Sequence, residues 1–235
     1  NSGTITVICS QTNEGGEGME SKATYTVNGG NIHVETKDDC INASKHIQIN
    51  GGTIYCSSSG NDAIDSNGTI TITGGITIAN GTSAPETSFD CDNNTFSVTG
   101  GIILGTGGGF STPTSTTNYF VNHSATPGNA ICLENSDGEI ILLYQLPTYS
   151  SAGDNQAGPG GGKPGGGGPG GNNGSSSMSF LFSDPVLSKG SSYTLTTGGT
   201  ISGGTSVNGY NLGGTYSGGT SKTFTITGTI TAVSM

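Results

Sequence analysis

The chain has 235 residues, of which 44 are Gly, six are Lys and none is Arg. Ser and Thr add 64 residues, hydrophobic residues make up 30%, and the formal net charge is −10. The lack of a basic surface argues against nucleic acid as a partner. No apolar run reaches the roughly 20 residues of a membrane span, and no window has the apolar spacing of a long helix. The composition leaves a disordered chain or a β architecture that needs few apolar residues per unit length.

A Gly-Gly pair recurs in the first half of the chain at residues 29–30, 51–52, 74–75 and 100–101. A short alternating strand precedes each pair, and a second strand follows it. A unit of this size cannot bury its own apolar face, but stacked units can, with counterparts about 4.8 Å apart. The intervals of 22, 23 and 26 residues therefore predict an all-β fold, a parallel β-helix with three short strands per coil.

Apolar residues at equivalent positions of the repeats form the expected inward columns. The strand before each Gly pair supplies two columns: Tyr25, Ile47, Ile70, Phe96, and Val27, Ile49, Ile72, Val98. The strand after it supplies two more, which Ile5 and Val7 begin: Ile32, Ile54, Ile76, Ile102, and Val34, Cys56, Ile78, Leu104. A further column consists of Met19, Ile41, Ile64 and Phe89. This agreement between columns argues against disorder for residues 3–105.

The repeat fades beyond Leu104, and residues 106–118 are predicted to be a loop. Two apolar runs at 130–134 and 139–146, joined by a turn at 135–138, predict a β hairpin. We therefore expect one domain in three parts. Residues 1–150 form the coils and the hairpin, 151–177 form a Gly/Pro-rich flexible excursion, and 178–235 form C-terminal β coils that close the same domain.

Eleven of the 16 acidic residues lie between Glu14 and Asp92, in two columns beside an inward position. The first column stands two residues before that position and contains Glu17, Asp39, Asp62 and Thr87. The second stands one residue after it and contains Glu20, Asn42, Asp65 and Asp90, with Asp92 beyond. Like charges roughly 5 Å apart repel by roughly 1 kcal/mol even in water, so this arrangement favours a bound cation.

Calcium fits the chemistry of these columns, because it takes about six to eight oxygen ligands from carboxylates, amides and the backbone. His is not part of the pattern, which argues against zinc and copper. The candidate ligands are Glu17, Glu20, Asp39, Asn42, Asp62, Asp65, Asp90 and Asp92. The alternative is a solvated acidic corner whose Asp and Asn residues only form turns.

These repeats resemble a known family. The motifs that carry the resemblance are Asp39-Cys-Ile-Asn, Ile47-Gln-Ile-Asn-Gly-Gly-Thr-Ile, Asp62-Ala-Ile-Asp-Ser-Asn-Gly-Thr-Ile-Thr-Ile-Thr-Gly-Gly, Phe182-Ser-Asp-Pro-Val-Leu and Gly213-Gly-Thr-Tyr-Ser-Gly-Gly-Thr. They are similar to the secreted bacterial carbohydrate-binding β-helix family related to polysaccharide lyases. The resemblance implies a right-handed parallel β-helix, several bound Ca²⁺ ions and binding of plant-type or acidic polysaccharides. Thr87 departs from the pattern, since it stands where the family has an acid.

The sequence thus predicts an extracellular or cell-surface calcium-binding protein that binds polysaccharide and is not an enzyme. His33 and Tyr55, outward on neighbouring coils, are the candidate sugar contacts, or else an ordinary exposed pair. Two other functions stay open. One is a calcium-dependent lyase with Lys22, Lys37 or Lys45 as the base. The other is a structural subunit whose ends associate into an extracellular fibre.

Overall fold

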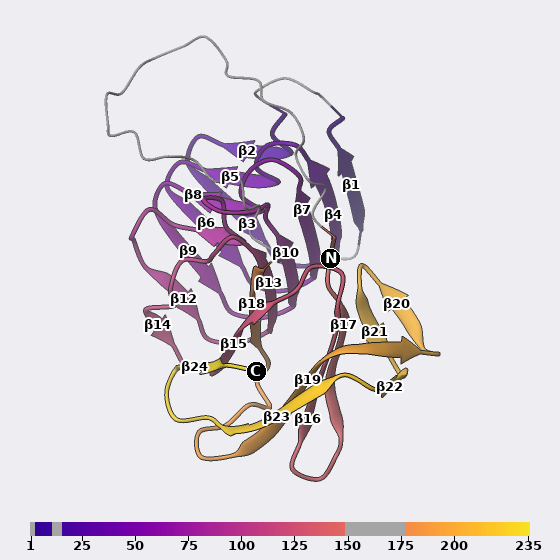
Figure 1. Cartoon of the computed structure of the whole chain (residues 1–235). Helices are drawn as coiled ribbons and strands as arrows, with labels where there is room; N and C mark the ends of the chain where they lie inside the picture. The colour runs from indigo at the N-terminus through magenta and orange to yellow at the C-terminus, as the bar shows by residue number, and fades with distance from the viewer. Residues whose placement is uncertain (1–2, 11–15, 149–176) are drawn as a thin grey trace, which may run out of the picture.

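The computed structural model describes residues 3–10, 16–148 and 177–235. Within these ranges the chain forms strands and no helix, so no helix there could cross a membrane. The strands build a parallel β-solenoid of about four turns, and an antiparallel sheet lies beside it (Figure 1). This architecture confirms the predicted parallel β-helix with three short strands per coil.

Each coil contributes one strand to each of three sheets. The first sheet has the order β1 (Thr4–Ile8), β4 (Asn31–Thr36), β7 (Thr53–Ser58), β10 (Ile76–Asn80), β13 (Ile102–Gly107), β18 (Met178–Ser183), β15 (Phe120–Ala125) and β24 (Ile230–Val233). The second has the order β11 (Phe89–Asp90), β8 (Ile64–Ser66), β5 (Ile41–Ala43) and β2 (Met19–Ser21). The third has the order β14 (Ser115–Thr116), β12 (Phe96–Val98), β9 (Thr69–Ile72), β6 (His46–Ile49) and β3 (Thr24–Val27).

The predicted inward columns of the second and third sheets are confirmed. Ile64 pairs with Ile41 on one side and with Phe89 on the other, and all three side chains are fully buried. Ile47 and Ile70 are paired and buried in the same way. These columns form one apolar core along the inside of the solenoid.

The Gly pairs form a corner where successive coils approach closely. Gly75 has a φ of +85°, which L side chains rarely adopt. A Cβ atom there would also lie 2.5 Å from the carbonyl oxygen of Gly52 in the preceding coil. The corner therefore needs Gly both for its backbone dihedral and for the stacking of the coils.

The strand after the Gly pair departs from the predicted register at β10. Ile54 lies opposite Thr77, and Cys56 lies opposite Ala79, instead of opposite Ile76 and Ile78. All four paired side chains, Ile54, Thr77, Cys56 and Ala79, are fully buried. The Gly pairs set this register, because their interval here is 23 residues whereas the predicted column used 22. A shift of one residue exchanges the inner and outer faces of a strand.

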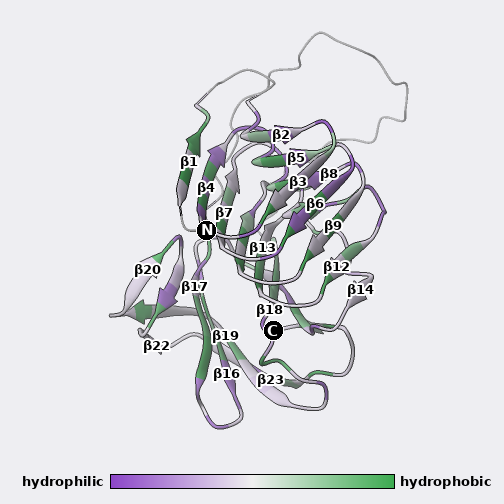
Figure 2. Cartoon of the chain, turned by 180° about the vertical axis from the view of Figure 1, so that it is seen from behind, coloured by the Kyte–Doolittle hydropathy of each residue, from purple (hydrophilic) through white to green (hydrophobic). Residues whose placement is uncertain are grey.

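The register shift turns apolar side chains of β10 and β13 outward, and a second core covers them. Ile78 and Leu104 are buried in this second cluster, together with Leu133 and Leu142 of the hairpin. The hairpin is as predicted, with β16 (Ala130–Asn135) antiparallel to β17 (Ile140–Gln145). Figure 2 shows hydrophobic residues along these two strands beside the solenoid.

The C-terminal strands differ from the expected coils. β19 (Ser192–Ser202), β20 (Thr205–Val207), β21 (Tyr210–Leu212), β22 (Thr215–Ser217) and β23 (Thr220–Thr225) extend the hairpin into an antiparallel sheet. β18 runs antiparallel between β13 and β15, and β24 alone of these strands pairs in parallel with a solenoid strand, β15. The C-terminal part thus extends the first sheet and covers its outer face. The predicted excursion at 151–177 lies outside the described residues, except for Ser177.

The segment predicted as a loop at 106–118 instead follows the fourth coil. β14 pairs in parallel with β12, and Thr114 N donates a hydrogen bond to the Phe96 carbonyl. Nearer its start, Ser111 N donates to the Phe89 carbonyl, and Gly109 O accepts from Ser88 N. This partial coil covers one end of the second and third sheets.

The register of β10 gives a prediction for Thr77. Its side chain is fully buried, and its Oγ1 has no hydrogen-bond partner in the described residues. Thr77→Val removes an unpaired buried hydroxyl at nearly constant volume, so we expect a gain of about 1 kcal/mol, or about 2–4 °C in Tm. Thr71→Val, on an outward position of β9, is the control and should give no comparable gain. A loss of stability in Thr77→Val would contradict this register.

Candidate functional site

The solenoid stacks the acidic residues as the sequence predicts. β2, β5, β8 and β11 each place an apolar side chain inward and the following residue outward. The outward column runs from Glu20 through Asn42 and Asp65 to Asp90, each paired with the next. Because parallel strands lie about 4.8 Å apart, these side chains are neighbours.

Three carboxylates meet at one point of this corner. Asp62, Asp65 and Asp90 each offer an oxygen, and these oxygens lie within 4.8 Å of one another. Asp62 is 8% exposed, and its Oδ1 accepts a hydrogen bond from the backbone N of Thr87. Ser111 Oγ, in the partial coil, donates to Asp90 Oδ1 at 3.2 Å. The side chains of Asp62 and Asp90 are thus held by a backbone and a hydroxyl donor.

In the first two coils, the carboxylates of the columns are paired mainly with donors from the protein itself. Asn42 Nδ2 donates to Asp39 Oδ2 at 3.1 Å and to Glu17 Oε1 at 3.5 Å. Asp39 also accepts from the backbone N of Asp62 at 3.2 Å. Glu20 forms an ion pair with Lys22. These four predicted ligands therefore lie in the acidic corner without joining the three-carboxylate cluster.

Asp92 lies just beyond the cluster. Its φ of +48° turns the chain after β11, and its side chain is exposed. Its backbone N donates to Asp90 Oδ1 at 3.1 Å, while its Oδ2 accepts from Asn67 Nδ2 at 3.5 Å. Of the eight predicted ligands, the structure brings Asp62, Asp65 and Asp90 together and leaves Asp92 beside them.

The acidic corner perturbs its own carboxyl groups. Burial, with the charges of Asp65, Asp62 and Asp38, raises the pKa of Asp39 to about 8. Burial, with the charges of Asp62, Asp90 and others, raises the pKa of Asp65 to about 7. The pKa of Asp62 is raised by burial and by Asp90 and Asp92, against a lowering by Thr87. Groups of this kind are poised to exchange a proton for a cation.

Two acidic residues outside the predicted columns also belong to this corner. Asp38 accepts a hydrogen bond from Asn61 Nδ2 at 2.6 Å, and its charge acts on Asp39. Burial and the charges of Asp62, Asp90 and Asp38 raise the pKa of Glu86. Glu86 immediately precedes Thr87, so an acid lies one position before the place in the column that Thr87 occupies. The sequence signal that could have identified Glu86 was an acid directly before the position where Thr87 departs from the acidic column.

The cluster has the donor set of a hard cation. The ion pairs of Lys22 and His33 are with Glu20 and Glu35, outside the cluster. Three carboxylates from neighbouring coils, with amide and hydroxyl oxygens beside them, match the oxygen ligands of Ca²⁺. An acidic corner neutralised by protons alone also fits these contacts.

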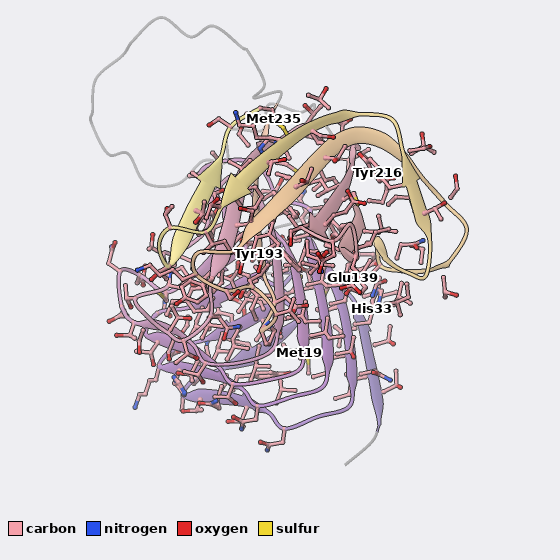
Figure 3. The ribbon with its side chains drawn as sticks, turned by 90° about the horizontal axis from the view of Figure 1, so that it is seen from below. Met19, His33, Glu139, Tyr193, Tyr216 and Met235 are labelled. Carbon is pink, nitrogen blue, oxygen red and sulfur yellow. The ribbon has the colours of Figure 1, made fainter. Side chains whose placement is uncertain are left out.

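The predicted sugar contacts do lie side by side. The rings of His33 and Tyr55 are 4.8 Å apart between centroids and tilted by 41°. His33 Nε2 lies 2.8 Å from Glu35 Oε1. Tyr55 is half-buried and packs against the second core, and burial raises its pKa. Figure 3 places His33 on the side of the solenoid that carries the antiparallel sheet. This packing covers part of the Tyr55 ring.

Residues 1–63 match a protein family described as carbohydrate-binding domain-containing protein. The match supports a carbohydrate-binding family, and with it carbohydrate binding as the function. It covers 63 of the 235 residues and includes the first half of the acidic columns as well as His33 and Tyr55. Searches of curated proteins and of solved structures found no match.

The pKa of Asp39 gives a pH prediction for the calcium-free protein. The pKa of this carboxyl rises from 3.8 to about 8 on folding, so the folded state binds the proton more tightly. The resulting stability is fully present below about pH 4 and is lost as the pH rises from there through 8. Without divalent ions, we therefore expect Tm to fall by at least about 2 °C between about pH 5 and about pH 9. Thermal melts of wild type and Asp39→Asn check this. The variant should show a flatter profile, and equal profiles would contradict the assignment.

Proposed function

We propose that this protein is an extracellular, calcium-binding β-solenoid that binds polysaccharide without catalysing a reaction. Carbohydrate binding rests on the family match of residues 1–63. The calcium part rests on the cluster of Asp62, Asp65 and Asp90, with oxygens within 4.8 Å of one another. Plant-type or acidic glycans are the proposed ligands, in keeping with the family that the repeats resemble.

A calcium ion at the cluster would act in two ways. It would neutralise stacked carboxylates that otherwise repel across neighbouring coils. It would also offer a positive centre to a uronate carboxylate, which matters because the chain has no Arg and only six Lys. Asp62, Asp65 and Asp90 would hold the ion, and Asp92 stands close enough for its charge to act on Asp62 and Asp65.

The calcium site predicts a stability change that the protein alone can show. Calcium at a hundredfold excess over its Kd should raise Tm by roughly 5 to 10 °C, and EDTA should reverse the effect. Asp65→Asn should lose most of this gain, because it removes a charged ligand. Asp137→Asn, in the exposed turn of the hairpin, is the matched control and should keep the gain. An equal calcium response in wild type and Asp65→Asn would exclude this cluster.

Carbohydrate binding is tested with a polysaccharide array in calcium and in EDTA. We expect retention on at least one plant-type or acidic glycan. If binding to the acidic glycans is lost in EDTA, calcium takes part in their recognition, because uronate carboxylates need a cationic partner. Silence on every glycan in calcium would contradict the proposed function.

A fibre subunit is a second proposal that one observation favours. Among the described residues, β1, β2 and β3 are edge strands of their sheets, and Ile5 and Ile8 on β1 are 47% and 66% exposed. Unpaired strand edges can add another chain. Electron microscopy at rising protein concentration distinguishes the two, because filaments would support the fibre and a strict monomer would exclude it. The lyase proposal gains no support from Lys22, which is paired with Glu20.

A further inference from the structure

A cavity of about 350 Å³ lies at the end of the acidic corner that is formed by β11 and the turn after it. It opens between the turn that follows β11 and the partial coil that covers the fourth turn. The lining residues used below are Asn93, Phe110, Ser111, Thr112 and Thr114. Its volume is near the small end of the range for ligand pockets, about 300 to 1,000 Å³, and suits one ring of a larger ligand.

The walls of the cavity are fixed by the two segments that form it. Ser111 Oγ accepts a hydrogen bond from Cys91 N at 3.0 Å and donates to Asp90 Oδ1 at 3.2 Å, which ties the partial coil to the turn. Phe110 is half-buried and packs against the apolar core of the solenoid. The cavity therefore has a rigid aromatic wall at a position set by the fold.

The rim of the cavity is polar and exposed. Asn93 has a left-handed backbone with φ of +62°, and Thr112 and Thr114 line the cavity from the partial coil. In the described residues these three side chains form no hydrogen bond with the protein. Amide and hydroxyl groups of this kind both donate and accept, as sugar hydroxyls do.

We propose that this cavity is the carbohydrate subsite and that it takes one hexopyranose ring of a polysaccharide. This inference rests on the proposed function and names its place. A pyranose has an apolar C–H face and a polar edge, which match the Phe110 ring and the rim of Asn93, Thr112 and Thr114. No Lys or His lines the cavity, and Asp90 touches its wall through Ser111. A neutral ring binds there directly, whereas a hexuronate needs a cation at the acidic cluster.

The subsite is tested by calorimetric titration with a neutral β-1,4-linked glucose hexamer and with a galacturonate hexamer, each in calcium and in EDTA. For the hexamer that wild type binds, Phe110→Ala should raise the Kd by on the order of tenfold. Asn93→Gly keeps the left-handed backbone, removes the amide and should weaken binding several-fold. His33→Ala is the control at the competing site and should bind as wild type does.

Each result has one meaning. Weaker binding in Phe110→Ala and Asn93→Gly, with the calcium shift in Tm retained, supports the subsite. Unchanged binding in both variants overturns it while leaving carbohydrate binding intact. If Phe110→Ala does not fold, Asn93→Gly decides, because its side chain is exposed. Wild type that binds neither hexamer overturns the subsite, and a silent polysaccharide array then overturns the proposed function as well.

Discussion

The parallel hydrogen-bond ladder between coils is the interaction on which the rest of the structure depends. It places each residue beside its counterpart one repeat earlier, about 4.8 Å away. Apolar counterparts such as Ile41, Ile64 and Phe89 then build a core from one side chain per strand. A chain with 30% hydrophobic residues can fold in this way because the same few positions are used in every turn. The Gly corner preserves this stacking, since a side chain at Gly75 would meet the backbone of the coil before it.

The same ladder that concentrates apolar residues also concentrates charge. It stacks Asp39 on Asp62 and Asp65 on Asp90, and burial removes part of the water that would screen them. The protein offsets some of this with Asn42, Thr87 and Ser111 as donors. What remains is a corner whose carboxyl groups favour a proton or a cation.

The outer face of the solenoid follows from the register of one strand. At β10 the Gly pair fixes the stacking, so Ile76 and Ile78 point outward and Thr77 points inward. These outward-pointing apolar side chains require a cover, and the hairpin with β19 provides it. That cover in turn packs against Tyr55, while the far corner with Phe110 and Asn93 stays open. A change of one residue in register thus decides which face of the first sheet the hairpin covers.

The sequence by itself determined the all-β class, the stacked repeat, most inward columns, the hairpin and the two acidic columns. These features are local or periodic, so spacing alone places them in register. Only the tertiary structure decided the register of β10, the antiparallel course of the C-terminal strands and the stacking of residues 109–116 on the fourth coil. Each of these depends on which surface is left to cover after the coils have stacked, a property of the assembled solenoid that no single repeat contains. The three-carboxylate cluster lies within the last regular coils, as the columns indicate, whereas one wall of the Phe110 cavity comes from residues beyond the point where the repeat fades.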